Sequence, residues 1–264
     1  MTVKYKVIVA HPDDEILFFS SVIKDASKVV ICFGPSADKN LTNGRQHLKT
    51  QLPLNNILFL DIPESSVFNS ANWKRPVKCR EGIVVGKSEF AYQQNYDSLK
   101  DQLAQILDYG ETIYTHNPWG EYGNEEHIQV FQVIMELSND FNLKVFVNCY
   151  VSNKSYLLMT QEQHLLSGEV YLGTPDVNLC SNFKKIYQAN QCWTWLDDYS
   201  WPKSELFYKL THDATCSKHI STRTSTPPIN MLSGNYRTNQ LKLAFGKILP
   251  VGIKSLLKRL LRET

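Results

Sequence analysis

The sequence predicts an α/β protein with a mostly parallel sheet. Five short apolar runs, each bounded by turn-forming residues, are typical of buried strands; they lie at 4–10, 28–33, 56–62, 112–115 and 144–151. Segments with helical periodicity separate most of these runs, and strands that alternate with helices favour a parallel sheet with crossover connections. At 264 residues the chain can bury a full core as one such domain, or as one domain plus a tail.

The segments between the strands are predicted as helices at residues 16–25, 45–52, 97–108 and 128–137. The second of these ends before Pro53, and the third places Leu99 and Leu103 on one side. Residues 65–94 show no clear periodicity. A long irregular segment in a compact domain is often a loop that faces the substrate, and the alternative is an ordinary surface excursion.

The C-terminal third gives weaker signals. Short helices are predicted at 161–166 and 183–188, and the aromatic run Cys192-Trp193-Thr194-Trp195 is expected to pack in the core. Residues 221–234 are rich in small polar residues and contain Pro227-Pro228, as in a linker or exposed loop. The predicted division is therefore a domain at 1–220, a linker or exposed loop at 221–240 and a tail at 241–264.

The tail is a predicted basic amphipathic helix. Between residues 240 and 264, six Lys or Arg against one Glu give +5, so the remainder of this +2 chain carries about −3. Such a helix suits either an anionic membrane surface or packing on the domain with its charged face in water. The small overall charge argues against a whole-molecule nucleic-acid binder.

The N-terminus and the cysteines bear on location. No signal-peptide core precedes the first strand, and no run of 18 apolar residues predicts a spanning helix. The six cysteines include no C-x-x-C pair, and Cys32 and Cys149 lie in strand-like runs as expected core thiols. We expect a cytoplasmic protein, with the tail as its one route to peripheral contact at the inner face of a membrane.

A first polar cluster, His11-Pro12-Asp13-Asp14-Glu15, directly follows the first predicted strand. Open α/β sheets bind ligands at the carboxyl ends of their strands. His11 and Asp14 are three residues apart and supply one nitrogen and one oxygen, as a catalytic zinc site requires, which leaves Asp13 as a base. The alternative is that Asp13 or Asp14 only caps the following helix.

A second polar stretch runs from His116 to His127, after the strand at 112–115. His127 lies at the start of a predicted helix, so both stretches are expected to meet at one edge of the sheet. His11, Asp14 and His127 together give two imidazoles and one carboxylate, with a position left open for water. A lone histidine is usually structural, but this one belongs to a dense polar cluster.

The two stretches resemble one family. Ala10-His11-Pro12-Asp13-Asp14-Glu15 followed by Gly120-Glu121-Tyr122-Gly123-Asn124-Glu125-Glu126-His127 is similar to the PIG-L/LmbE family of zinc-dependent N-deacetylases, which act mostly on N-acetylglucosamine-type groups. The resemblance covers roughly Val3 to Val151, and the C-terminal third matches only loosely, through features such as Trp193-Thr194-Trp195 and Glu205. With the strand pattern, it leads us to expect a Rossmann-like three-layer sandwich.

The resemblance implies a role for each matching residue. His11, Asp14 and His127 match the zinc ligands, and Asp13 matches the general base. Arg45 matches an arginine that contacts substrate. Tyr122 matches a tyrosine that helps to stabilise the oxyanion.

The chain departs from the family at two positions. Asn124 stands where the family usually has a histidine for oxyanion stabilisation or acid catalysis. The asparagine amide can donate a hydrogen bond but cannot carry a proton. Leu48 stands where a glutamate is common. His116, at the end of the adjacent strand, is a second candidate acid; a structural histidine is the alternative reading.

The expected function is zinc-dependent hydrolysis of an N-acetyl group from an amino-sugar or sugar conjugate, in a pathway such as cell-surface glycan biosynthesis. The alternatives are a zinc amidohydrolase acting on a non-sugar amide and a sugar-binding protein with weakened turnover. A dinucleotide-binding dehydrogenase is set aside because no G-x-G-x-x-G follows the first strand. The sequence does not indicate an oligomeric state.

Overall fold

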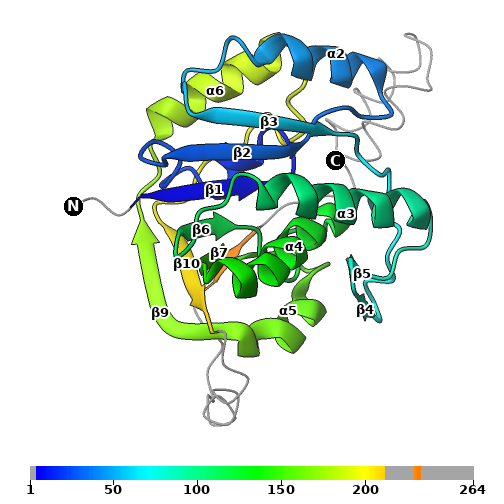
Figure 1. Ribbon diagram of the computed structural model, residues 1–264. Coiled ribbons are helices and arrows are strands. Elements are labelled where there is room, and N and C mark those ends of the chain that lie inside the picture. Colours follow the sequence, from blue (N-terminus) through cyan, green and yellow to red (C-terminus); the bar gives the residue numbers. More distant parts are fainter. Residues whose placement is uncertain (1–3, 212–228, 233–264) are drawn as a thin grey trace, which may run out of the picture. The chain divides into compact units, whose positions relative to one another are not determined.

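The computed structural model describes residues 4–211 and 229–232, which form a seven-stranded sheet in the order β3-β2-β1-β6-β7-β10-β9 (Figure 1). Neighbours from β3 through β7 are parallel, whereas β10 is antiparallel to both β7 and β9. The predicted α/β fold with a mostly parallel sheet is confirmed. The strands are β1 (Tyr5–Val9), β2 (Lys28–Phe33), β3 (Ile57–Ile62), β6 (Thr112–Thr115), β7 (Lys144–Asn148), β9 (Leu166–Gly173) and β10 (Glu205–Leu210).

Helices flank the sheet on both sides. α4 contacts β1, β6 and β7 and packs against α3, while α2 packs against α6. Figure 1 shows these two helix pairs on opposite sides of strands β1 to β3. The helices are α1 (Asp14–Phe18), α2 (Lys39–Leu48), α3 (Glu89–Ala104), α4 (Glu125–Phe141), α5 (Tyr156–Glu162), the 3-10 turn η1 (Gln163–Leu165) and α6 (Val177–Ala189). Two small pairings join β4 (Lys78–Cys79) to β5 (Gly82–Ile83) and β8 (Tyr150–Val151) to β11 (Asn230–Met231).

The central strands are buried on both faces, which explains why they stand out in the sequence. Every residue from Val29 to Phe33 in β2 and from Lys6 to Val9 in β1 is buried. A strand covered by helices on both sides is apolar throughout rather than alternating. Cys32 and Cys149 lie in this core, as expected.

The first helix is shorter than predicted. α1 ends at Phe18 rather than near residue 25, because the next amide groups bind a carboxylate instead of the preceding turn. The backbone N–H groups of Ser20 and Ser21 donate to Glu205 over 3.3 and 2.8 Å, and both hydroxyls do the same. This buried cluster ties the first motif to β10, a strand far away in the sequence.

Two other helices begin earlier than predicted. α2 starts at Lys39 because Asp38 accepts a hydrogen bond from Asn40 N, although 38–44 resembles a polar loop. α3 starts at Glu89, within the segment read as irregular, and its buried face includes the tyrosines Tyr92 and Tyr96. The hydroxyls of both tyrosines donate hydrogen bonds to α4, so the buried face of α3 contains polar and aromatic groups as well as aliphatic ones.

The C-terminal third contains strands that the sequence reading missed. β9 is an edge strand with an exposed middle, and β10 lies antiparallel beside it. The helix expected at 183–188 is the second half of α6, and most of 161–166 is α5 and η1. In the aromatic run, Cys192 is buried as expected, whereas Trp193 and Trp195 are half-buried and Thr194 is exposed.

The predicted tail at 241–264 and most of the predicted linker lie outside the described residues. The described part of the linker, 229–232, includes β11. Residues 195–199 group with a second compact unit, in which Trp195 lies edge-on to Tyr199. Within the part of the chain that the structure describes, no helix is long and apolar enough to cross a membrane.

The contact between α2 and the end of α6 gives a prediction about stability. A Cβ atom on Gly44 would lie 2.1 Å from the carbonyl oxygen of Asn190. Gly44→Ala should therefore lower the free energy of unfolding by about 1–3 kcal/mol through overpacking, although alanine favours an exposed helix by about 1 kcal/mol. Urea unfolding measures the change. Asn43→Ala, at the exposed neighbouring position, should be neutral or stabilising; a gain in stability for both variants would contradict this packing.

Candidate metal centre

The two polar stretches follow neighbouring strands. β1 pairs in parallel with β6, with Ile8 opposite Thr115, so both strands end at the same edge of the sheet. The first stretch turns directly into α1, and the second leads through a tight loop into α4. The topology therefore brings the two stretches together, as the sequence predicted.

Three donor atoms converge at this edge. His11 Nδ1 and His127 Nε2 lie 3.3 Å apart. Asp14 Oδ2 lies 3.3 Å from the first and 3.2 Å from the second. All three side chains are buried, and together they form a group that could hold a metal ion.

The dimensions of this triangle fit a tetrahedral zinc site. Nitrogen and oxygen ligands at about 2.0–2.1 Å from one tetrahedral ion lie about 3.3 Å from each other. The three measured separations of 3.2–3.3 Å match that spacing. Two imidazoles and one carboxylate with a fourth position open form a donor set used by catalytic zinc.

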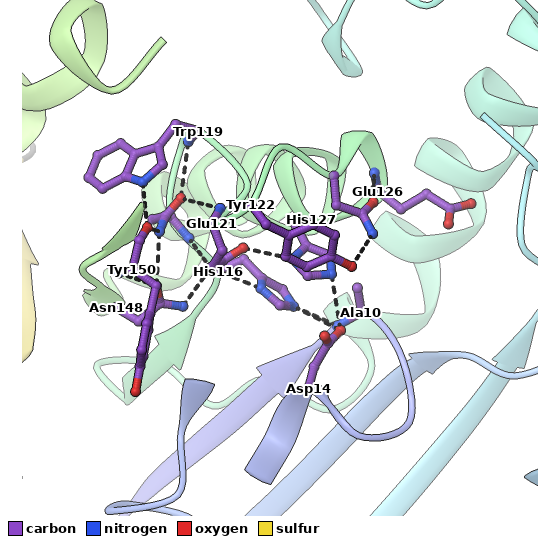
Figure 2. Close-up of polar contacts among 12 residues, drawn as sticks. Ala10, Asp14, His116, Trp119, Glu121, Tyr122, Glu126, His127, Asn148 and Tyr150 are labelled. Atoms are coloured by element: carbon purple, nitrogen blue, oxygen red, sulfur yellow. Dashed lines mark hydrogen bonds and ion pairs between the residues drawn. The ribbon is translucent and has the colours of Figure 1, made fainter. Parts of the chain in front are cut away.

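Carboxylates hold the other nitrogen of each imidazole. His127 Nδ1 lies 2.6 Å from Glu121 Oε2, and His11 Nε2 lies 2.9 Å from Glu126 Oε2. Figure 2 shows His127 linked to Glu121 on one side and to Asp14 on the other. A carboxylate that accepts the N–H of a histidine fixes the tautomer, so the lone pair of the opposite nitrogen faces the metal position.

Glu121 is fixed in turn by a buried polar network. Its Oε1 accepts from Asn148 Nδ2 over 2.5 Å and from Asn117 N over 3.2 Å. Asn117 also donates to Tyr150 O. The same carbonyl oxygen accepts from the indole of Trp119, and Figure 2 shows this contact. The second possible metal group, His116, Glu121 and His127, consists of this supporting layer and shares His127 with the first.

The site carries an excess of negative charge. Burial alone would lower the pKa of His11, but Asp14 and Glu126 outweigh it and raise the pKa to about 10. For His127, burial is likewise outweighed by Asp14 and Glu121, which raise the pKa to about 9. Surroundings that stabilise a positive charge on both imidazoles also favour a bound cation.

Asp13 lies beside this triangle and outside it. Its backbone is left-handed, with φ of 94°, a conformation that costs about 1–3 kcal/mol for a residue other than glycine. Its Oδ2 accepts hydrogen bonds from Thr194 Oγ1 at 2.7 Å and Thr194 N at 3.1 Å. Burial and the nearby Asp14 raise the pKa of Asp13 to about 7.

Arg45, the residue expected to contact substrate, is almost fully buried. Its Nη1 donates to Gly34 O at 2.9 Å and to Glu64 Oε1 at 2.5 Å. Within the described residues its Nε has no hydrogen-bond partner. Burial alone would lower the pKa of Arg45, but the charge of Glu64, followed by those of Asp13 and Asp14, raises it.

Asn124 and Tyr122 form a pair at the start of α4. Asn124 Oδ1 accepts from Glu126 N and caps the helix, while its Nδ2 donates to Tyr122 Oη over 2.9 Å. Asparagine is among the preferred N-cap residues. The tyrosine ring lies edge-on to His127.

His116 is buried with both ring nitrogens facing protein atoms. Its Nε2 accepts from Ala10 N over 2.8 Å, and its Nδ1 lies 3.1 Å from Glu121 Oε1. Burial lowers the pKa of His116, and the neighbouring His127 lowers it further. This geometry favours the structural reading of His116 over the role of proton donor.

Sequence reasoning assigned no role to Glu121, Glu125, Glu126 or Thr194. The three glutamates lie inside the quoted second stretch, and Glu125 accepts from the backbone of Ser70 and Ala71, which fixes part of the 65–94 segment beside the site. Several glutamates close to histidines in the sequence can indicate carboxylates that orient histidine ligands, so these three residues could have been singled out. Nothing in the sequence connects Thr194 to Asp13.

Removing the charge of Glu121 should weaken metal binding without removing a ligand. Glu121→Gln is expected to lower zinc affinity about 10- to 100-fold, the usual effect of changing a residue that orients a ligand. Competition with a chromogenic chelator measures the affinity. Glu169→Gln, which changes a surface carboxylate paired with Lys209, is the matched control. Equal affinities for the wild type and both variants would exclude the orienting role.

The chain was compared with families, curated proteins and solved structures. No family model matches the chain, and no curated protein matches it. Among solved structures it is similar to Dbv21, described as the deacetylase of the antimicrobial reagent A40926 pseudoaglycone. The TM-score is 0.45 and the sequence identity 9%, over 80% of this chain and 98% of that chain.

Proposed function

We propose that this chain is a zinc-dependent N-deacetylase of the PIG-L/LmbE type, which removes an acetyl group from an amino-sugar or a sugar conjugate. The observation that carries the proposal is the triangle of His11, Asp14 and His127, in which a carboxylate holds the outer nitrogen of each imidazole. The reaction class comes from the resemblance of the two motif stretches to that family. His11, Asp14 and His127 would hold zinc, which supplies a Lewis acid that polarises the acyl carbonyl and lowers the pKa of water.

Asp13 is assigned the proton transfers. Hydrolysis forms a C–O bond from water, breaks the C–N bond and moves one proton from water to the amine. Thr194 occupies Oδ2 of Asp13, so Oδ1 accepts the proton from water and then donates it to the leaving nitrogen. Burial, followed by the charge of Asp14, raises the pKa of Asp13 above that of an ordinary carboxyl group, which is the direction expected for a general base.

Tyr122 and Asn124 are assigned to the oxyanion. Their mutual hydrogen bond fixes both polar groups next to His127. Donors fixed before the reaction stabilise the charge that develops on the acyl oxygen. Because the amide of Asn124 cannot transfer a proton, the proposal gives the acid step to Asp13 alone. His116 as a catalytic acid stays a prediction that the geometry does not favour.

Arg45 is assigned to substrate binding. Its guanidinium is buried and has one N–H group without an acceptor among the described residues. A buried donor without a partner costs free energy, and a substrate oxygen would satisfy it. The sugar-like character of the substrate rests on the family resemblance.

The test of the function is the release of free amine by zinc-loaded protein. Asp13→Asn should retain the metal and lower the turnover number about 10²- to 10⁴-fold, the usual contribution of a general base. Metal content and amine release from N-acetylated monosaccharides, sugar conjugates and peptides measure the two properties.

The matched control is Asp140→Asn, on the exposed end of α4, which should behave as wild type. Loss of zinc in Asp13→Asn would make Asp13 a ligand rather than a base. Release of amine from peptides alone would favour a non-sugar amidohydrolase, and binding of sugars without turnover would favour a sugar-binding protein.

A further inference from the structure

Asp13 receives its hydrogen bonds from a part of the chain that carries neither motif. Thr194 lies beyond α6 and is separated from Asp13 by 181 positions, yet it donates to one carboxylate oxygen through two groups. The hydroxyl lies at 2.7 Å and the backbone N–H at 3.1 Å, both on Oδ2. Within the described residues, Oδ1 accepts no hydrogen bond. The two oxygens of Asp13 are therefore in different environments.

The backbone of Asp13 is fixed from the same side. Its N–H donates to Glu15 Oε2 over 2.9 Å, and Glu15 Oε1 accepts the hydroxyl of Tyr187 over 2.6 Å. Tyr187 belongs to α6, which ends shortly before Thr194. The region from α6 to Thr194 thus holds Asp13 in two ways. Tyr187 fixes the backbone of Asp13 through Glu15, and Thr194 binds the side chain of Asp13 directly.

Without the contact from Thr194, the carboxylate of Asp13 would have other positions to occupy. Arg45 attracts it electrostatically, and the adjacent metal position accepts carboxylate oxygens. Two donors on one oxygen restrict rotation about the last side-chain torsion, and catalysis depends on such orientation. The hydrogen bonds keep Asp13 next to the metal position and outside the ligand triangle.

We propose that Thr194 is a positioning residue that holds Oδ2 of Asp13 and thereby presents Oδ1 for proton transfer. The inference rests on the proposed function, because the effect on turnover requires Asp13 to be the base. It assigns the C-terminal third a specific part in the site, which the two motifs do not contain. Thr194 itself does not touch the reacting atoms in this proposal.

The test compares Thr194→Val, which keeps the shape and loses the hydroxyl, with Thr194→Ser, which keeps the hydroxyl. The valine variant should lose at least about tenfold in turnover number with little change in KM, and serine should restore most of it. Thr160→Val, at a half-buried position far from the motifs whose hydroxyl donates to the backbone carbonyl of Leu157, should have no effect. Equal losses for valine and serine would overturn the proposal.

A double-mutant cycle separates positioning from a general structural role. In the Asp13→Asn background, Thr194→Val should change turnover less than twofold, because the group that it positions is already inactive. If the two substitutions instead lower the turnover number by independent factors that multiply, Thr194 does not act through Asp13.

A crystal structure of zinc-loaded Thr194→Val tests the same point without turnover. The proposal predicts that the carboxylate of Asp13 rotates away from its wild-type position, and an unchanged carboxylate would overturn it. If the wild type releases no amine from any acetylated compound, the proposed function fails, and the crystal structure still decides the positioning role.

Discussion

The site depends on two contacts between a carboxylate and an imidazole, Glu121 with His127 and Glu126 with His11. Each contact fixes which ring nitrogen carries the hydrogen, so that the two remaining nitrogens face Asp14. The three donors would lie close together without these glutamates, but the tautomers would be undetermined. The ligand triangle is therefore only the inner part of a larger polar structure.

The fold is arranged around the burial of this charge. Asp14, Glu121 and Glu126 are almost completely inaccessible, and buried carboxylates without compensation are strongly destabilising. Asn148 and Ser65 supply hydrogen bonds to Glu121 and Glu126, respectively. The backbone amide at position 65 also donates to Glu126, and those at 70 and 71 donate to Glu125, so the second motif holds the long segment after β3. A dication in the triangle would offset much of the remaining repulsion.

The sequence predicted the parts of the molecule that depend on local patterns. β2 and β6 match the predicted bounds because strands buried on both faces are apolar throughout. The candidate ligands lie close together because β1 and β6 are neighbouring parallel strands whose carboxyl ends meet at one edge of the sheet. The start of α2 was missed because its first half, around Asn43 and Gly44, has low helix propensity. Here a capping aspartate and packing against α6 determine the structure.

The missed features share a physical cause, which is dependence on distant partners. α1 ends early because Glu205 binds the amides of Ser20 and Ser21. Thr194, which follows α6, donates to Asp13 across 181 positions of the sequence. Neither contact leaves a periodic or local signal. The motifs thus supply the candidate ligand triangle, while the C-terminal third completes the surroundings of Asp13.

The most direct test of the central claim is the zinc content of purified protein, after zinc is supplied and the excess removed. We expect about one zinc per chain in wild type and in His164→Ala, which alters an exposed histidine, and little zinc in His127→Ala. That result would support a metal centre built on the triangle. Wild type without zinc, or His127→Ala with a full complement, would contradict it.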